Sequence, residues 1–273
     1  YDGMIIKYSA EGECEWAKGI GGSESDKIKS VAECSDGGII AGGDCYSYRI
    51  DLGNGVSLTR KGIMNGMIIK YSAEGECEWA KGIGGWSYDK IISVAETSDG
   101  GCIAGGFFSS SIDLGNGVGL AHTGSENGMI IKYSAEGEVQ WAKGIGSTSN
   151  DYINSVAETS DGGIIVGGYF ESSSIDLENG ISLTNKGQRD GMVIKYDKTE
   201  LPNPITVQAK GIGDSGEEYI CSVAETSDGG YVAGGYFRSS SIDLGNGVSL
   251  KKKGSYDGMI IKYSAEGECE WAK

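Results

Sequence analysis

One segment of eighteen residues recurs along the chain and limits what the chain can fold into. Residues 1–18 and 256–273 are identical, and near copies occupy 65–81, 127–143 and, in degraded form, 190–210. The marker glycines Gly3, Gly66, Gly128, Gly191 and Gly258 are 63, 62, 63 and 67 residues apart. A fixed period of this length indicates structural repeats that must stack on one another to bury their apolar faces.

Each repeat contains four short segments typical of β-strands. In the first repeat these are 4–8 (strand C), 13–18 (strand D), 28–33 (strand A) and 39–43 (strand B). Asp-Gly and Glu-Gly turns tolerate the positive φ of tight antiparallel hairpins, and no stretch has a sustained helical period. The pattern predicts an all-β β-propeller of four-stranded antiparallel blades with about 62–63 residues per repeat. A parallel β-helix ranks well below, because its coils are shorter.

The repeat also predicts where each blade begins and ends. Pairing each A–B hairpin with the following C–D hairpin gives four complete blades, 27–83, 90–145, 152–212 and 219–273, and a half blade of strands C and D at 1–20. We expect 1–273 to be a single β-propeller domain or a fragment of a larger one, and we favour a fragment or an engineered excerpt. An unpaired half blade exposes a sheet edge, which could pair with the other end of its own chain or with a second molecule by self-association.

Charge and cysteine content exclude several classes of protein. A formal net charge of −16 argues against a nucleic-acid partner and against an anionic membrane surface. The chain lacks an apolar run of membrane-spanning length, so we expect no membrane insertion. The seven cysteines contain no Cys-x-x-Cys pair, so we interpret them as small packing residues and expect neither a zinc site nor a disulfide framework.

Two recurring features predict how blades contact each other. Strand B carries a glycine pair in every repeat, as at Gly42-Gly43, and glycine inside a strand usually marks close backbone approach. Strand D carries a tryptophan, which we expect to pack between adjacent blades. The tryptophans at this position are Trp16, Trp79, Trp141 and Trp271, whereas the fourth copy has Gln208.

Together these motifs resemble a known repeat family. The run from Ser93 to Gly101, then Ala-Gly-Gly-Phe-Phe, Ile-Asp-Leu-Gly-Asn-Gly, Asn-Gly-Met-Ile-Ile-Lys-Tyr and Trp-Ala-Lys-Gly-Ile-Gly, is similar to the bacterial SBBP-type β-propeller repeats. The resemblance covers nearly the whole chain. It implies a propeller in a secreted or cell-surface bacterial protein, with strand A lining the central channel, and it supplies no catalytic residues.

The connections between strands fall into two classes. Antiparallel order places the A–B and C–D turns on one face and the D–A and B–C connections on the other, here called the loop face. The turns hardly vary between repeats, whereas the loop face does, and each B–C connection contains a predicted miniature hairpin around Asn-Gly. One C–D turn, 197–204, is four residues longer and holds both prolines; we interpret it as local drift.

The loop face holds the candidate binding residues. Its aromatic and basic candidates are Trp86, Tyr88, Tyr152, Tyr219, Arg60 and Lys252. One acid recurs just before strand A, at Asp26, Asp89, Asp151 and Glu218. These carboxylates could form a ring that holds calcium, which is the one cofactor considered, or each could accept hydrogen bonds from its own loop.

The sequence predicts a protein without enzymatic activity. Its single histidine, His122, lies in a variable connection, and it contains none of the nucleophile elbow, phosphate-loop or zinc-protease motifs. We expect a non-catalytic binding module that contacts a protein or glycan through the loop face. The alternatives are a carbohydrate-binding, lectin-like propeller and a purely structural spacer in a surface repeat protein.

Overall fold

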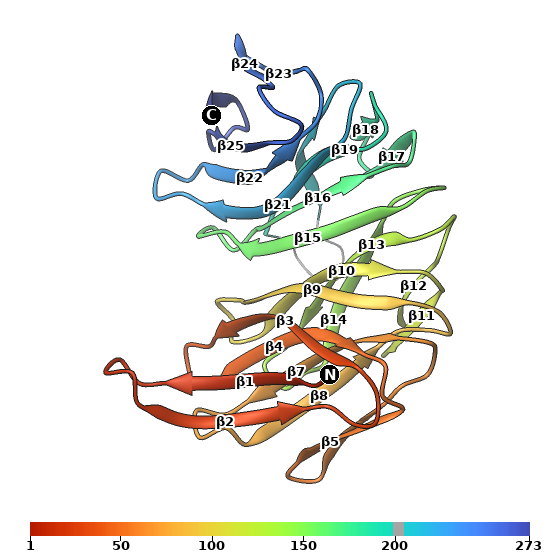
Figure 1. Ribbon diagram of the computed structural model, residues 1–273, viewed down its shortest axis with the longest axis vertical. Helices are drawn as coiled ribbons and strands as arrows, with labels where there is room; N and C mark the ends of the chain where they lie inside the picture. The colour runs from red at the N-terminus through yellow and green to blue at the C-terminus, as the bar shows by residue number, and fades with distance from the viewer. Residues whose placement is uncertain (199–204) are drawn as a thin grey trace. The chain divides into compact units, whose positions relative to one another are not determined.

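The computed structural model describes residues 1–198 and 205–273, and every regular element in them is a β-strand (Figure 1). Strand A is β3 (Asp26–Glu33), β9 (Asp89–Glu96), β15 (Asp151–Glu158) and β21 (Glu218–Glu225). Strand B is β4 (Ile39–Cys45), β10 (Cys102–Phe108), β16 (Ile164–Phe170) and β22 (Tyr231–Phe237). Strand C is β1 (Gly3–Tyr8), β7 (Asn65–Tyr71), β13 (Asn127–Tyr133), β19 (Asp190–Tyr196) and β25 (Asp257–Tyr263). Strand D is β2 (Cys14–Ile20), β8 (Cys77–Ile83), β14 (Val139–Ile145), β20 (Thr206–Ile212) and β26 (Cys269–Ala272).

These strands form the predicted blades. The four-stranded sheets have the orders β3-β4-β7-β8, β9-β10-β13-β14, β15-β16-β19-β20 and β21-β22-β25-β26, and β1-β2 form a two-stranded sheet. Strands pair antiparallel throughout the first, third and fourth of these four-stranded sheets, between β9 and β10, and between β1 and β2. The predicted fold class, a β-propeller with four complete blades and one half blade of strands C and D, is therefore confirmed. We number the complete blades one to four in chain order.

The B–C connections contain the miniature hairpins expected from Asn-Gly. They are β5 (Arg49–Gly53) with β6 (Val56–Thr59), β11 (Ile112–Gly115) with β12 (Val118–Leu120), β17 (Ser174–Asp176) with β18 (Ser182–Thr184), and β23 (Ser241–Gly245) with β24 (Val248–Lys251). Asn54 and Asn116 at the tips have φ of 51° and 52°, and the following glycines are also positive. Asn-Gly supplies this left-handed turn at low steric cost, so the prediction holds.

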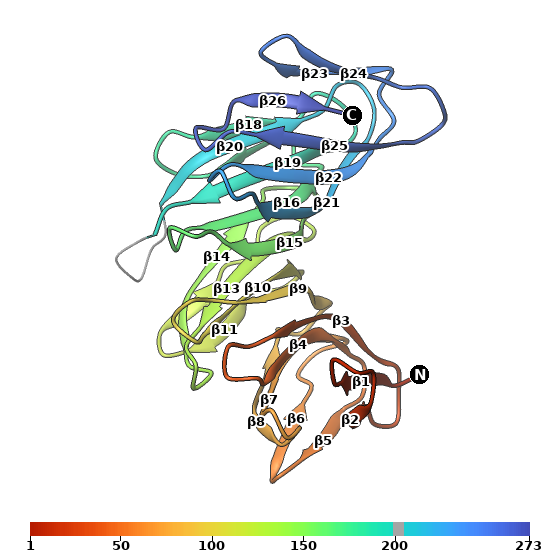
Figure 2. The same cartoon turned by 90° about the vertical axis from the view of Figure 1, so that its left-hand side faces the viewer.

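The chain forms two compact units, residues 1–122 with 131–143 (unit 1) and residues 123–130 with 144–273 (unit 2). Within unit 2, the sheet of blade three packs against that of blade four (Figure 2). A Cβ added to Gly167 on β16 would lie 2.6 Å from Val223 Cγ1 and 2.7 Å from Ile220 Cγ2 on β21. The close approach that the strand B glycines predicted is therefore present.

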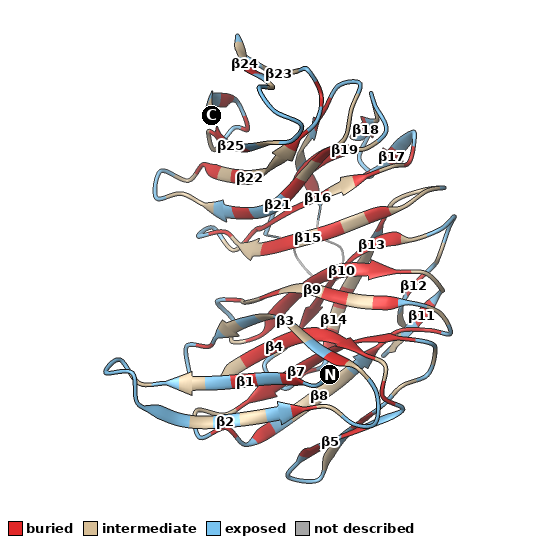
Figure 3. Cartoon of the chain, viewed as in Figure 1, coloured by how far each residue is buried: buried red, intermediate tan, exposed pale blue. Residues whose placement is uncertain are grey.

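Burial follows this stacking. Figure 3 shows buried residues concentrated on strands B and C of the complete blades, whereas β1 and β2 alternate with exposed positions. In β4 every residue after Ile39 is buried. The near-continuous apolar runs of strand B reflect burial on both faces of the sheet, which allows no polar alternation.

Two of the strand D tryptophans, Trp16 and Trp79, contact the next blade as predicted, whereas Trp271 on the last strand is 43% exposed. In unit 1, Trp16 Nε1 donates to the Ala73 carbonyl and Trp79 Nε1 to the Ala135 carbonyl, each at 2.9 Å. Their rings lie 6.0 and 6.2 Å from Tyr71 and Tyr133. In unit 2, Gln208 Nε2 replaces the indole and donates to the Ala265 carbonyl at 2.8 Å.

Four further predictions concern local features. All seven cysteines are free thiols, of which Cys14 and Cys221 are exposed. Within the described residues no helix could span a membrane. Residues 199–204 of the long proline-containing turn lie outside the described residues. Met4 and Tyr8 of β1 are 71% and 57% exposed, and self-association through this half blade stays a prediction.

Candidate functional site

The D–A and B–C connections meet at the start of each strand A. In unit 1 the amide of Asp89 donates to the Met64 carbonyl at 3.0 Å, and in unit 2 the amide of Glu218 donates to the Arg189 carbonyl at 2.8 Å. Parallel bridges join Met64 to Tyr88 and Arg189 to Glu217. We call each such meeting point a junction. The predicted loop face is built from these junctions.

The acid before strand A is buried in its junction and holds the two connections together by hydrogen bonds. Asp26 is 1% exposed and accepts hydrogen bonds from the amides of Gly22, Tyr46 and Ser47 at 3.0–3.1 Å, and from Ser47 Oγ at 2.6 Å. One carboxylate thereby links the D–A connection to the chain leaving strand B. This is the structural alternative that the sequence left open, in which each acid bonds its own loops.

The other three acids bind in the same way. Asp89, Asp151 and Glu218 are fully buried and accept from the amides of Gly85, Ser147 and Asp214, respectively. Burial raises the pKa of Asp89 to about 6 and also raises the pKa of Asp151. Among residues 1–198 and 205–273, no group of three or more His, Cys, Asp or Glu side chains has the arrangement of a metal site. The calcium ring stays a prediction, because its four carboxylates belong to two different units.

Three large apolar side chains are exposed at the Asp89 junction of unit 1, and a fourth, Tyr48, is exposed in the B–C connection that leads to this junction. Tyr48, Ile63, Trp86 and Tyr88 expose 66%, 47%, 82% and 42% of their surface, and we call them the apolar patch. Their loops are joined directly. The Ile63 amide donates to the Ser87 carbonyl at 3.2 Å, and the amide of Arg60 donates to the Tyr48 carbonyl at 2.9 Å. Arg60 Nη1 also donates to the Ile63 carbonyl.

Serine side chains hold the patch loop in place. The amide of Trp86 donates to Ser110 Oγ at 3.0 Å, and the amide of Tyr88 donates to Ser109 Oγ at 2.9 Å. Ser109 Oγ donates to the Tyr88 carbonyl at 2.6 Å. The exposed rings are thus presented by a hydrogen-bonded scaffold, which lowers the entropy cost of binding through them.

The other junctions are polar at the same positions. Trp86 is replaced by Ser23, Thr148 and Ser215; Tyr88 by Ser25, Asn150 and Glu217; Ile63 by Ser125, Gln188 and Ser255; and Tyr48 by Ser173 and Ser240. The repeat fold accepts polar residues at all four positions, so folding does not require the apolar patch.

A second aromatic group lies in unit 2. Tyr152 and Tyr169 are stacked at 4.9 Å, Tyr219 and Tyr236 at 4.5 Å, and an edge contact of 4.8 Å joins Tyr169 to Tyr219. We call these four residues the tyrosine stack. The Arg189 guanidinium lies 4.7 Å from the rings of both Tyr169 and Tyr219. It is also paired with Glu171, with its Nε donating to Oε1 at 2.8 Å.

The tyrosine stack occupies positions that are ionic in unit 1. Strand register places Asp44 at the position of Tyr169, and Lys90 at the position of Tyr219. Lys90 Nζ lies 3.8 Å from Asp44 Oδ1. An ion pair and an aromatic contact therefore serve the same blade-to-blade packing, and we interpret the half-buried tyrosine stack as structural.

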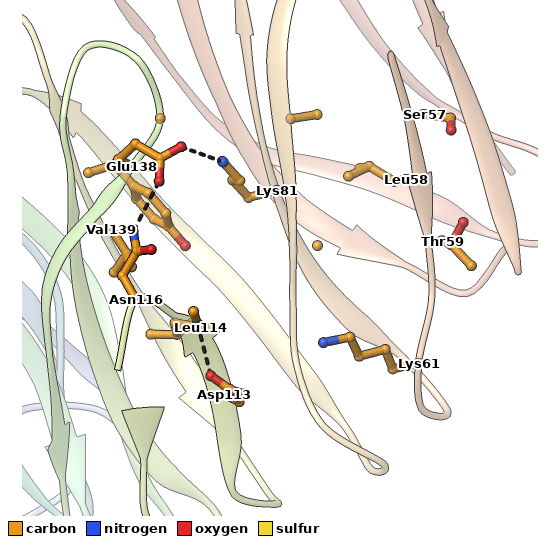
Figure 4. Close-up of a pocket in the computed structure, with 15 residues that line it drawn as sticks. Ser57, Leu58, Thr59, Lys61, Lys81, Asp113, Leu114, Asn116, Glu138 and Val139 are labelled. Atoms are coloured by element: carbon orange, nitrogen blue, oxygen red, sulfur yellow. Dashed lines mark hydrogen bonds and ion pairs between the residues drawn. The ribbon is translucent and has the colours of Figure 1, made fainter. Parts of the chain in front are cut away.

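A polar cavity of about 480 Å³ lies in unit 1, and no residue of the apolar patch lines it (Figure 4). The tip of the β11–β12 hairpin and the start of β14 line one side, and β6 and β8 line the other. Lys81 Nζ lies 3.7 Å from Glu138 Oε1, and Asn116 Nδ2 donates to Glu138 Oε2 at 3.0 Å. These charged groups are already paired with each other, so we do not assign a ligand here.

The structure separates the predicted binding residues. Trp86, Tyr88 and Arg60 belong to one junction of unit 1, whereas Tyr152 and Tyr219 belong to the tyrosine stack of unit 2. Lys252 lies in the B–C connection of blade four, where its amide donates to the Ser240 carbonyl at 3.0 Å. His122 packs edge-on to Phe108 at 6.0 Å.

Sequence reasoning missed Tyr48 and Ile63 in the patch and Tyr169 in the stack. Aligning the B–C connections would have found the first two, because the repeats are polar there. Tyr169 follows from strand register, which pairs it with Tyr152.

Comparisons with known proteins find similar proteins but do not assign the chain to a family. No family model matches the chain. It is 23% identical over 282 residues to the regulatory protein FlaEY of Caulobacter vibrioides, covering 97% of this chain and 29% of that protein. It is 28% identical over 157 residues to an uncharacterized WD repeat-containing protein of Acanthamoeba polyphaga mimivirus, covering 54% of this chain and 11% of that protein. The chain thus spans less than a third of these curated relatives.

Similar solved structures include the WD40 domain of Neurospora crassa Pan2, with a TM-score of 0.44, 10% identity and coverage of 97% of this chain and 64% of that one. The periplasmic gluconolactonase PpgL of Pseudomonas aeruginosa has a TM-score of 0.38, 10% identity and coverage of 98% and 81%. Both TM-scores are low, so the fold assignment rests on the strand order of the chain itself. Membership of the SBBP-type family stays a prediction.

Proposed function

We propose that the chain is a non-catalytic binding module that contacts a protein partner through the apolar patch on its loop face. The observation that carries this proposal is Trp86, which is 82% exposed at a position where the other junctions have serine or threonine. Exposing a large aromatic ring costs solubility and brings the fold no stability. A contact outside the fold is the physical reason to keep it there.

The composition of the patch suits a protein partner. Trp, Tyr and Arg are the residues that most often dominate the free energy of protein–protein binding. The patch combines Trp86 and two tyrosines with Arg60, which lies against the Tyr48 and Ile63 loops. A lectin built from repeats would be expected to repeat its sugar-stacking ring, and a spacer needs no apolar junction. The resemblance to SBBP-type repeats further supports a cell-surface or secreted location.

The proposal is tested by making the patch resemble the other junctions. The variant combines Ile63→Ser, Trp86→Ser and Tyr88→Ser, which are residue types found at equivalent positions. Proteins of the source organism are captured on immobilised wild-type and variant chains and quantified by mass spectrometry, and the Kd of each captured protein is then measured. We expect the patch variant to lose about 2 kcal/mol or more, roughly thirtyfold in Kd, with an unchanged Tm.

The matched control is Thr148→Ala at the position of Trp86 in a polar junction. It should bind like the wild type. Equal binding by all three chains would contradict a role for the patch. Binding to a glycan array that disappears with Trp86→Ser would instead assign a lectin.

A further inference from the structure

One buried carboxylate lacks a partner. Asp190 is fully buried at the junction between blades three and four of unit 2. Its Oδ2 accepts a hydrogen bond from the Lys186 amide at 3.1 Å, but its buried Oδ1 has no hydrogen-bond partner. A charged oxygen left in this state would cost several kcal/mol, so the site requires a proton or a cation.

Two of the three other junctions carry an amide at this place, whereas the Asp26 junction carries Asp2, which is exposed to solvent and needs no internal partner. Asn65 and Asn127 occupy the position of Asp190, and their Oδ1 atoms accept from the Lys61 and Thr123 amides as Asp190 Oδ2 accepts from Lys186. Their Nδ2 atoms therefore stand where Asp190 has Oδ1. The repeat fold provides a position for a hydrogen-bond donor, and Asp190 fills it with an oxygen.

The surroundings of that position are hydrogen-bond acceptors. Asn65 Nδ2 donates to the carbonyls of Met64 and Gly85 at 3.3 and 3.4 Å, and to Asp89 Oδ2 at 3.4 Å. Asn127 Nδ2 donates to the Ser147 carbonyl at 3.3 Å. At the Asp190 junction the counterpart of the Asp89 carboxylate is Glu218, which is itself fully buried. Two carboxyl groups thus replace an amide and a carboxylate.

The space around Asp190 favours a proton over a metal ion. A Cβ placed on Gly213 would overlap the Asp190 carboxyl group, and one placed on Gly84 would overlap the Asn65 amide. Both groups therefore fill the same close-packed position against a glycine. A proton needs no added volume, whereas calcium needs six to eight oxygen ligands.

We propose that Asp190 and Glu218 form a proton-sharing acid pair, in which protonated Asp190 donates from Oδ1 to the Glu218 carboxylate and so closes this junction. The proton comes from solvent and returns to it as the pH rises. Deprotonation leaves two buried carboxylates side by side, which repel each other. Arg189 and Tyr219, which flank the pair in the sequence, belong to the contacts of the tyrosine stack, so the pair makes that contact sensitive to pH.

The electrostatic surroundings agree with this assignment. Burial raises the pKa of Asp190, and the charge of Glu218 raises it further, while the Lys186 amide, the Lys186 ammonium and the Gly187 amide lower it. The neighbouring Arg189 is paired with Glu171. A folded-state pKa above the unfolded value means that the stabilisation is complete below about 3.8 and is lost as the pH rises through the folded-state pKa.

The test uses Asp190→Asn, which installs the residue found at the Asp89 and Asp151 junctions, and Asn127→Asp, which places a buried acid beside Asp151. Tm is measured against pH for the full chain. In acid we expect Asp190→Asn and the wild type to have nearly the same Tm. As the pH rises, the Tm of Asp190→Asn should exceed that of the wild type, by about 3 °C for each unit by which the pKa of Asp190 is raised. At neutral pH, Asn127→Asp should have a lower Tm than the wild type.

Carbon-13 NMR and a calcium titration provide two further tests of the proposal. Carbon-13 NMR of labelled aspartate should show one carboxyl group that titrates well above its ordinary value and disappears in Asp190→Asn. A Tm difference that does not depend on pH, or an ordinary titration of Asp190, would overturn the proposal. Millimolar calcium chloride that raises the Tm of the wild type but not of Asp190→Asn would overturn it in favour of a shared cation.

Discussion

At the scale of single residues, substitutions between repeats are compensated by their neighbours. Gln208 stands where other blades have tryptophan, and it keeps the hydrogen bond to the next blade. The Gln208 side chain fills less apolar volume than a tryptophan would. The space is taken by Tyr231, which occupies the position of Ile39 and Cys102, stacks on Tyr263 at 5.0 Å and places its hydroxyl 3.5 Å from Gln208.

This compensation predicts coupling between the two positions. Gln208→Trp alone should overpack the junction against Tyr231 and cost about 1–3 kcal/mol of unfolding free energy. Combining it with Tyr231→Ile recreates the arrangement at Trp16 and Ile39, and should recover most of that loss. Urea denaturation of the double-mutant cycle measures the coupling. Simple additivity of the two changes would show that Tyr231 does not fill the space of the missing indole.

At the scale of elements, strand B sets how closely blades approach. Its glycine faces the next strand A, as Gly167 faces Val223 and Ile220 in unit 2. The glycine at the same position of β22 is Gly234, and a Cβ there would meet nothing within 4 Å. The same residue in the same kind of strand therefore has two different surroundings.

These surroundings predict opposite effects of one substitution. Gly167→Ala should lower the free energy of unfolding by about 1–3 kcal/mol, because its methyl group would force β16 and β21 apart. Gly234→Ala should be neutral or stabilise by about 0.5–1 kcal/mol, since alanine restricts the unfolded chain. Thermal and urea unfolding of both variants provide the comparison. Equal destabilisation would mean that glycine is needed for the strand itself rather than for the blade contact.

At the scale of the whole molecule, one ion pair recurs in every complete blade. The strand C lysine reaches the aspartate of the A–B turn: Lys70–Asp36 at 2.8 Å, Lys132–Asp99 at 2.8 Å, Lys195–Asp161 at 3.4 Å and Lys262–Asp228 at 3.0 Å. The hydrogen bond from Lys70 lowers the pKa of Asp36. A threonine hydroxyl lowers the pKa of Asp161 and of Asp228, and at Asp99 the hydrogen bonds outweigh burial.

Lowered pKa values in all four blades predict loss of stability in acid. The ion pairs stabilise the folded state fully above the unfolded-state pKa of 3.8. This stabilisation is lost as the pH falls below that value, because the folded-state carboxylates must then be protonated. Asp36→Asn leaves the buried Lys70 without its anion and should cost about 1–3 kcal/mol at pH 7. The cost should shrink as the pH falls through the lowered folded-state pKa of Asp36, since the wild-type carboxyl then becomes neutral as well.

The control for this prediction is Asp51→Asn in an exposed hairpin. Its carboxylate accepts a hydrogen bond from the Gly53 amide at 3.0 Å and forms no ion pair with a lysine in residues 1–198 and 205–273. We expect a change within about 0.5 kcal/mol over the same pH range. An Asp36→Asn effect that does not shrink as the pH falls would mean that shape, not charge, sets the cost.

The sequence by itself determined the repeat, the four strands of each blade, the hairpins around Asn54 and Asn116, and the inter-blade role of Trp16 and Trp79. These features follow from local turn chemistry and from a period that places like residues in like positions. The loop-face candidates Trp86 and Tyr88 were also visible, because they interrupt an otherwise polar pattern.

Which of these residues meet is visible only in the tertiary structure. The B–C connection returns beside the D–A connection, so Ile63 lies at the same junction as Trp86 and Tyr88. Tyr152 and Tyr219 lie in an inter-blade stack, and Asp190 and Glu218 are both buried at one junction. Contacts between segments far apart in the sequence depend on how sheets stack, and a one-dimensional repeat does not contain that geometry.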